Sequence, residues 1–247
     1  MSEISKNEFD YKIGRLKRSK AYLDYCEEVY GYRMYLFNMM DREQLEYVFT
    51  SIPLSSSDTL LDLGCGTGQI LQALAERNGC FGIGIDQLNS DVMDISGTHT
   101  KYLRGDIDEV NSASLSPTVT IAVDSLYFSR DLEALIGSLH SIKGNKMYLF
   151  YSQYSFEGSR LTKEALKKDC TEIAAILNRL EIPYRTIEYS ENERLMYERS
   201  LKALERLEEE FAIEGNADLF EEKRREQLLG RQLYATGNAS RFLYITD

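Results

Sequence analysis

A glycine-rich loop is the clearest sign of a ligand site in this sequence. Gly64, Gly66 and Gly68 follow the apolar run 59–63, which predicts a buried parallel strand, and lead into residues 68–78, which predict an amphipathic helix. Glycine lets the backbone approach a ligand closely, and a helix N-terminus can face that ligand. Asp62 stands just before the glycines, where a carboxylate would repel a pyrophosphate but suits an ammonium or a sulfonium. The loop therefore predicts a site for a cationic ligand.

Two further carboxylates follow predicted strands. Asp86 ends the strand 81–85, about twenty residues after the glycine loop, where a carboxylate can accept both hydroxyls of a ribose. A simpler interpretation of Asp86 is the N-cap of a helix over 87–95. Asp124 ends the strand 118–123, and two aromatic residues follow it closely. Because ligands of open parallel sheets bind beyond the carboxyl ends of the strands, we expect the chemistry near Asp124.

The loop 62–68, Asp86 and the pair Gly105-Asp106 together resemble the cofactor-binding motifs of the class I S-adenosylmethionine-dependent methyltransferases. The resemblance implies a Rossmann-like α/β fold, with a seven-stranded, mostly parallel sheet, helices on both faces and an antiparallel pair formed by the last two strands. It implies S-adenosylmethionine as cofactor and S-adenosylhomocysteine as product, with Asp106 binding the adenine amine and Ile107 covering the ring. The cofactor contacts predicted in this way are Asp62, Gly64, Cys65, Gly66, Gly68, Asp86, Gln87, Asp106, Ile107 and Asp124.

The order of the predicted elements fits one α/β domain with additions. Residues 1–57 form a helical preface, with a polar arm over 1–12 and two helices within 19–49, and residues 58–247 form the methyltransferase domain. The charged segment 191–235 is expected as a helical insertion, broken at 214–216, before the last strand. The other strands are expected at 100–104, 146–151, 184–189 and 242–246, and the other helices at 131–142 and 161–180.

The amino-acid composition limits the kinds of partner that we expect for this protein. The net charge of -11 and the pI near 4.9 argue against a nucleic-acid partner, which needs clustered Lys and Arg, and favour a small-molecule or peptide acceptor. Four cysteines without metal-ligand spacing and only two histidines predict no metal site. The sequence shows no apolar signal core and no apolar run of about 20 residues, so we expect a cytoplasmic protein with reduced thiols and without a membrane partner. A monomer or a homodimer fits equally well.

Three functions remain open for the loop after the fourth strand. The leading hypothesis is N-methylation of an amine, in which Asp124 attracts the cationic amine by charge and Tyr127 holds it by cation–π attraction. The alternative is C- or O-methylation of an aromatic or enolizable metabolite, with a tyrosinate or Asp as the base. His99 and His140 are poorly placed for that role. A protein that binds the cofactor without turnover is the third possibility.

The aromatic residues of the preface form a candidate lid. Tyrosines recur through the two helices predicted within 19–49, where their rings either cap the core or line a pocket. The residues predicted to form the lid and the substrate site are Tyr25, Tyr30, Tyr32, Tyr35 and Phe128.

Overall fold

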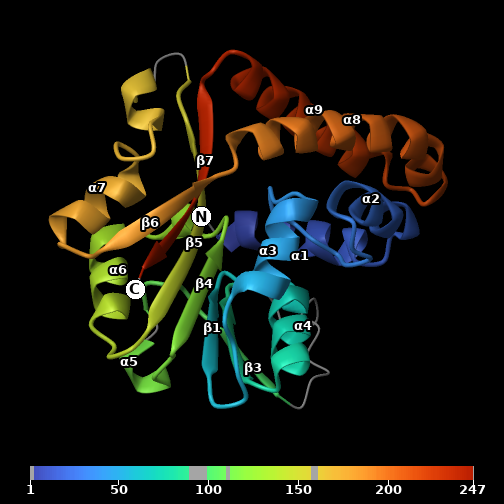
Figure 1. The fold of residues 1–247 in the computed structure, drawn as a ribbon. Helices are drawn as coiled ribbons and strands as arrows, with labels where there is room; N and C mark the ends of the chain where they lie inside the picture. Colours follow the sequence, from blue (N-terminus) through green and yellow to red (C-terminus); the bar gives the residue numbers. More distant parts are fainter. Residues whose placement is uncertain (1–2, 89–98, 110–111, 157–160, 247) are drawn as a thin grey trace.

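The computed structural model describes residues 3–88, 99–109, 112–156 and 161–246. Within these residues, seven strands form one sheet with the order β3-β2-β1-β4-β5-β7-β6 (Figure 1). The strands are β1 (Thr59–Leu63), β2 (Phe81–Asp86), β3 (Thr100–Arg104), β4 (Val119–Val123), β5 (Lys146–Tyr154), β6 (Tyr184–Glu188) and β7 (Ala239–Thr246). The first five are parallel, and β7 runs antiparallel to both β5 and β6. The predicted fold class and the antiparallel pair are confirmed.

Helices cover both faces of the sheet because the buried side chains of its central strands alternate between them. In β1, Leu60 packs on one side with α4 (Gln69–Asn78), whereas Leu61 packs on the other with α6 (Leu132–His140) and α7 (Glu172–Arg179). The inner parallel strands β1, β2 and β4 are mostly buried on both sides, which explains why they are largely apolar runs in the sequence. The edge strand β3 is more exposed and carries Lys101 and Arg104. A short helix α5 (Ser112–Leu115) and the 3₁₀ turns η2 (Leu126–Phe128) and η3 (Lys163–Leu166) lie in the connections.

The N-terminal helices and the inserted helices pack together. The preface contains α1 (Glu3–Leu16), α2 (Lys20–Tyr30) and α3 (Arg42–Ser51), and the insertion forms the antiparallel hairpin of α8 (Ser190–Ile213) and α9 (Ala217–Ala235). Helix α2 lies against α8, and the hairpin crosses one end of the molecule (Figure 1). A shared core of tyrosine, leucine and phenylalanine side chains joins these helices to the α4 side of the sheet.

Two predicted elements are wrong. A polar arm was expected over residues 1–12, but residues 3–12 belong to α1, whose Ile13 is buried and whose Arg15 donates two hydrogen bonds of 2.7 Å to Asp218 of α9. The helix expected over 161–180 is reduced to α7, because Thr171 adopts an extended conformation and accepts the Ala174 N–H, so a new helix begins there. The predicted helix over 87–95 lies largely outside the described residues. None of the described helices is both long and apolar enough to span a membrane.

Candidate active site

A cavity of about 850 Å³ opens at the carboxyl ends of β1, β2 and β4, which is a volume typical of a ligand site. Every residue predicted to contact the cofactor lines this cavity except Gly68. The cavity is closed on other sides by residues 35–38, by residues 123–130 and by Phe9, Asp10 and Ile13 of α1. The chain thus brings its N-terminal helix and its glycine loop to one cavity.

The glycine loop has the conformation that its sequence requires. Gly64 has a φ of +70°, and a Cβ added there would lie 2.2 Å from the Cβ of Ser125. Gly68 has a φ of +83° and precedes α4, and a Cβ there would lie 2.4 Å from the Tyr102 ring. Only glycine fits either position. Gly68 therefore shapes the turn and the start of α4, and it does not line the cavity.

Asp86 ties the glycine loop to the end of β2. Its two carboxylate oxygens accept the Gly66 N–H at 2.8 Å and the Leu88 N–H at 2.9 Å. Each oxygen keeps a further lone-pair direction, so the carboxylate can still accept the hydroxyls of a ribose. Burial raises the pKa of Asp86. The geometry is compatible with the predicted ribose contact.

Asp62 is a buried acid at the base of the cavity. It is 3% exposed, and burial together with the nearby Asp86 raises the pKa of Asp62 to about 8. A cation placed in the cavity would favour the ionised form of this carboxyl.

The predicted adenine end lies where β3 ends. Ile107 is buried and lines the cavity, and the Asp106 carboxylate accepts the Asp108 N–H at 3.1 Å. Arg130 lies over this end, 3.4 Å from Asp106 and 3.1 Å from Glu109. An apolar side chain beside a carboxylate suits the face and the amine of an adenine.

Tyr127 is not placed as a base. Its ring lines the cavity and lies 4.6 Å from the Tyr151 ring, but its hydroxyl accepts the backbone N–H of Ser152 at 2.6 Å. Burial raises the pKa of Tyr127 well above its ordinary value, so the phenol stays protonated. The Tyr127 phenol is therefore not available as a tyrosinate base, whereas its ring, which was expected to hold a cationic amine, lines the cavity.

Asp124 is not a free carboxylate, contrary to the prediction. Arg241 of β7 donates to both of its oxygens, at 2.6 and 3.1 Å, and one oxygen also accepts the Met39 N–H at 2.8 Å. The charge that was expected to hold a cationic amine is already balanced within the protein. The sequence does contain a sign of this ion pair, because Arg241 is a charged residue in the otherwise mostly apolar segment 239–246. Arg241 was not among the predicted site residues.

The predicted lid residues separate into two groups. Tyr35 and Phe128 line the cavity. Tyr25 and Tyr30 are instead fully buried in the core, where their hydroxyls bond Ser200 and the Asn38 carbonyl, and Tyr32 bonds Glu46 at the surface. The placement of these three tyrosines in the substrate site is wrong, because helix α2 turns Tyr25 and Tyr30 into the core and the Tyr32 ring packs on Phe49.

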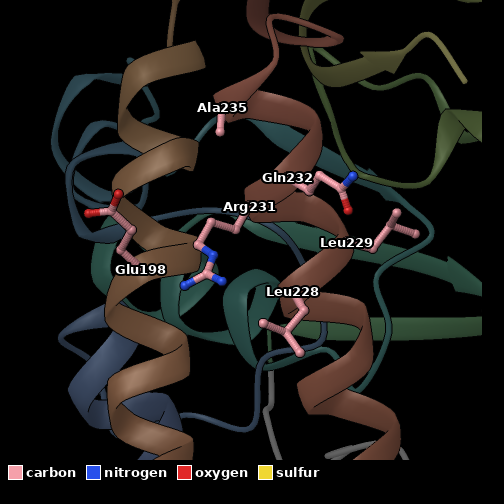
Figure 2. Close-up of a pocket in the computed structure, with 6 residues that line it drawn as sticks. All are labelled: Glu198, Leu228, Leu229, Arg231, Gln232 and Ala235. Atoms are coloured by element: carbon pink, nitrogen blue, oxygen red, sulfur yellow. The ribbon is translucent and has the colours of Figure 1, made fainter.

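A second hollow lies on the helical hairpin. This groove has a volume of about 580 Å³, and Arg231 of α9 extends into it beside Glu198 of α8 (Figure 2). It shares no lining residue with the cavity at the glycine loop. The residues that the structure describes contain no cluster of three His, Cys, Asp or Glu side chains able to hold a metal ion.

Comparisons with known proteins support the fold. The family model described as methionine biosynthesis protein MetW matches residues 42–134, which is less than half of the chain. No curated protein matches, whereas 236 chains of solved structures do.

Three of these structures illustrate the likeness. Phosphoethanolamine N-methyltransferase 2 from Haemonchus contortus, solved with phosphomonomethylethanolamine and S-adenosylhomocysteine, has a TM-score of 0.70 at 15% identity, over 95% of this chain and 60% of that chain. The present chain therefore covers less than two thirds of the length of the Haemonchus chain. Cyclopropane synthase MmaA2 from Mycobacterium tuberculosis has a TM-score of 0.67 at 14% identity, with 96% and 97% covered. An S-adenosylmethionine-dependent methyltransferase from Geobacter sulfurreducens has a TM-score of 0.61 at 14% identity, with 90% and 97% covered.

These identities are low, so what they establish is the architecture. The sheet order, the glycine loop at the end of β1 and the structural matches agree with one another. The chain thus has the fold of the S-adenosylmethionine-dependent methyltransferases among these structures.

Proposed function

We propose that this protein transfers a methyl group from S-adenosylmethionine to an amine nitrogen of a small molecule that carries no phosphate group. The observation that carries the proposal is the charge of the cavity. Six acidic residues line it, namely Asp10, Asp62, Asp86, Asp106, Glu109 and Asp124. They outnumber the two arginines that pair with them, Arg130 and Arg241, even while Asp62 holds its proton. Such a lining attracts cations and repels anions.

Arg130 is the basic residue among the described residues that line the cavity. It is 65% exposed in its side chain and is surrounded by Asp106, Asp108 and Glu109. Its charge is thus already balanced at the predicted adenine end. Recognition of a phosphorylated acceptor would need free Lys or Arg side chains near the methyl acceptor, which this lining does not offer.

The residues of the cavity fit S-adenosylmethionine. The Asp86 carboxylate would accept from the ribose, Asp106 and Ile107 would hold the adenine, and Asp62 would lie near the positive charge of the ligand. When bound there, S-adenosylmethionine supplies a methyl group on a positively charged sulfur. The protein's own contribution is to hold the two reactants in position, which can supply several kcal/mol of the barrier without a dedicated acid or base.

Aromatic rings form the acceptor end of the cavity. Tyr35 and Phe37 contribute from the preface, and Tyr127 and Phe128 contribute from η2. Each ring can attract a cationic amine into the cavity by about 0.5 to 2 kcal/mol. The amine must then lose its proton to solvent before its nitrogen attacks the methyl group. Because Arg241 balances Asp124, we assign the attraction of the amine to these rings and to the overall negative lining.

C- or O-methylation is less well supported because the acidic lining disfavours the phenolate or enolate that would have to form there, and no base among the described residues is placed to generate one. Neither His99 nor His140 lines the cavity, and the Tyr127 hydroxyl is bonded to Ser152. The phosphorylated amine named for the Haemonchus protein would meet an acidic wall here.

The proposal is tested by measuring S-adenosylhomocysteine release from purified protein across amines, phenols and carbon acids, with each amine paired with its phosphorylated form. We expect turnover with an amine and at least tenfold lower kcat/KM for its phosphorylated partner. Turnover only with phenols or carbon acids would refute N-methylation, and a preference for the phosphorylated forms would refute the charge argument. Cofactor binding without turnover across the panel would indicate a non-catalytic binding protein.

The substitution Tyr127→Phe tests the role of the phenol separately. We expect kcat to stay within about threefold while the melting temperature falls, because the buried Ser152 N–H loses its acceptor at a cost of about 1 to 3 kcal/mol. Tyr151→Phe, which removes a hydroxyl bonded to Glu172 at 2.7 Å, is the control for the loss of a nearby phenol. A fall in kcat of a hundredfold with unchanged cofactor affinity would restore Tyr127 as a catalytic residue.

A further inference from the structure

A buried charged cluster lies directly behind the acceptor end of the cavity. Its centre is Arg241, which is 0% exposed and donates to Asp124, to the Ser152 hydroxyl at 2.8 Å and to Gln44 at 2.5 Å. Glu193 of α8, also 0% exposed, lies 3.6 Å from the Arg241 guanidinium. The cluster therefore joins β7, the end of β4, the start of α3 and the helical hairpin.

Glu193 is held by hydroxyl groups. One of its oxygens accepts from Ser152 at 2.7 Å and from Tyr234 at 2.6 Å, and the other accepts from Tyr197 at 3.0 Å. Tyr154 lies 3.1 Å from the second oxygen and also 2.9 Å from the sulfur of Met39. The helical hairpin is in this way connected to the segment that carries Met39.

This cluster fixes the wall of the acceptor end. Asp124 has a φ of +53°, a conformation that a residue with a side chain rarely adopts, and its carboxylate accepts the Met39 N–H. The same segment is held at its other end, where the Tyr35 N–H donates to Gln69 at 2.6 Å. Residues 35–38 between these two anchors line the cavity.

Stability alone gives a weak reason for such a cluster. Removing charged groups from water costs several kcal/mol for each ion, and well-packed apolar residues often replace a buried ion pair without loss of stability. Directional hydrogen bonds from one guanidinium to Asp124, Ser152 and Gln44 instead define the relative position of three segments.

We propose that Arg241 is the positioning residue of the methyl acceptor site. It fixes Asp124, and through the Asp124–Met39 hydrogen bond it fixes residues 35–39, so that acceptor affinity depends on Arg241 more strongly than cofactor affinity does. The acceptor part of this inference rests on the proposed function, and the positioning of residues 35–39 does not.

The test compares Arg241→Lys with the unmodified protein, since lysine keeps the charge but loses the forked geometry. Amide hydrogen exchange of the free protein is measured over a peptide that contains residues 35–40, cofactor affinity by calorimetry and acceptor KM by turnover. We expect at least tenfold faster exchange at the Met39 amide, a Kd for S-adenosylmethionine within threefold and an acceptor KM raised at least tenfold. Gln44→Met, which removes one acceptor of Arg241 and keeps the ion pair, is expected to shift exchange and KM in the same direction by a smaller factor.

Tyr25→Phe controls for general loss of stability, because it removes a buried hydrogen bond between α2 and α8 away from the cavity. It should lower the melting temperature and leave exchange at Met39 and the acceptor KM unchanged. Unchanged exchange at Met39 in both the Arg241 and the Gln44 variants would overturn the inference, as would an acceptor KM that stays constant. If no acceptor is turned over, the proposed function fails, and faster exchange at Met39 still supports the positioning. If Arg241→Lys does not fold, Gln44→Met decides by the same measurements.

Discussion

Replacing Asp86 with alanine is expected to weaken the binding of S-adenosylmethionine by about 10- to 150-fold. A hydrogen bond to a charged group contributes about 1.5 to 3 kcal/mol, and each 1.4 kcal/mol corresponds to a factor of ten in affinity. The same carboxylate accepts the Gly66 and Leu88 N–H groups, so its removal also loosens the glycine loop. Both effects act in the same direction, because the cofactor would meet a site that is less ordered and lacks its ribose contact.

Calorimetric titration of the variant with S-adenosylmethionine measures this loss. Asp58→Ala is the matched control, since Asp58 also accepts a backbone N–H, from Ser55, and bonds Thr118, but it lies just before β1, away from the cavity. We expect the control to lower the melting temperature and to leave the Kd within twofold. An unchanged Kd in Asp86→Ala would contradict the predicted ribose contact and leave Asp86 with a capping role alone.

The parallel sheet could be predicted because its signals are local. Its inner strands are short, largely apolar runs, each followed closely by a polar or glycine residue, and the glycine loop identifies the first crossover. The long helix expected over 161–180 fails because an apolar periodicity does not show where Thr171 begins a new helix. The helix α1 was missed because its polar residues face solvent or bond α9, a distant segment whose position no local pattern reveals.

The cofactor end and the acceptor end of the candidate site also differ in how much local sequence reveals about them. The predicted cofactor residues follow strands directly, so the parallel sheet alone brings Asp62, Asp86 and Asp106 to one edge. The acceptor end combines the preface with the loop after β4 and is supported by Arg241 from β7, more than a hundred residues away from Asp124. No local pattern pairs these residues, and for the same reason Asp124 was predicted to offer a free charge.

The substitution Asp62→Asn is expected to abolish most of the pH dependence of cofactor binding between pH 5 and 8. In the free protein the pKa of Asp62 is about 8, so the carboxyl holds a proton over this range. A positively charged ligand favours the ionised form, so binding lowers the pKa of Asp62 and releases the proton. The affinity of the unmodified protein should therefore rise with pH, by at most about tenfold per unit, and level off above pH 8.

The stability of the free protein should change in the opposite direction. Unfolding returns the pKa of Asp62 to about 3.9, so between pH 4 and 8 the folded state binds a proton that the unfolded chain has lost. Stability from this group is fully present below pH 4 and is lost as pH rises through 8, a loss that Asp62→Asn does not show. Melting temperatures of the two proteins without ligand measure the difference.

Calorimetry at several pH values, in two buffers with different ionisation enthalpies, counts the protons released on binding. The ligand's own protonation changes are the same for both proteins and cancel in the comparison. Asp86 is present in both proteins. Parallel pH profiles of affinity for the two proteins would exclude Asp62 as the acid coupled to the bound cation. A steeper rise in the unmodified protein, with more protons released, would place a positive charge of the ligand, its sulfonium or its ammonium, beside Asp62.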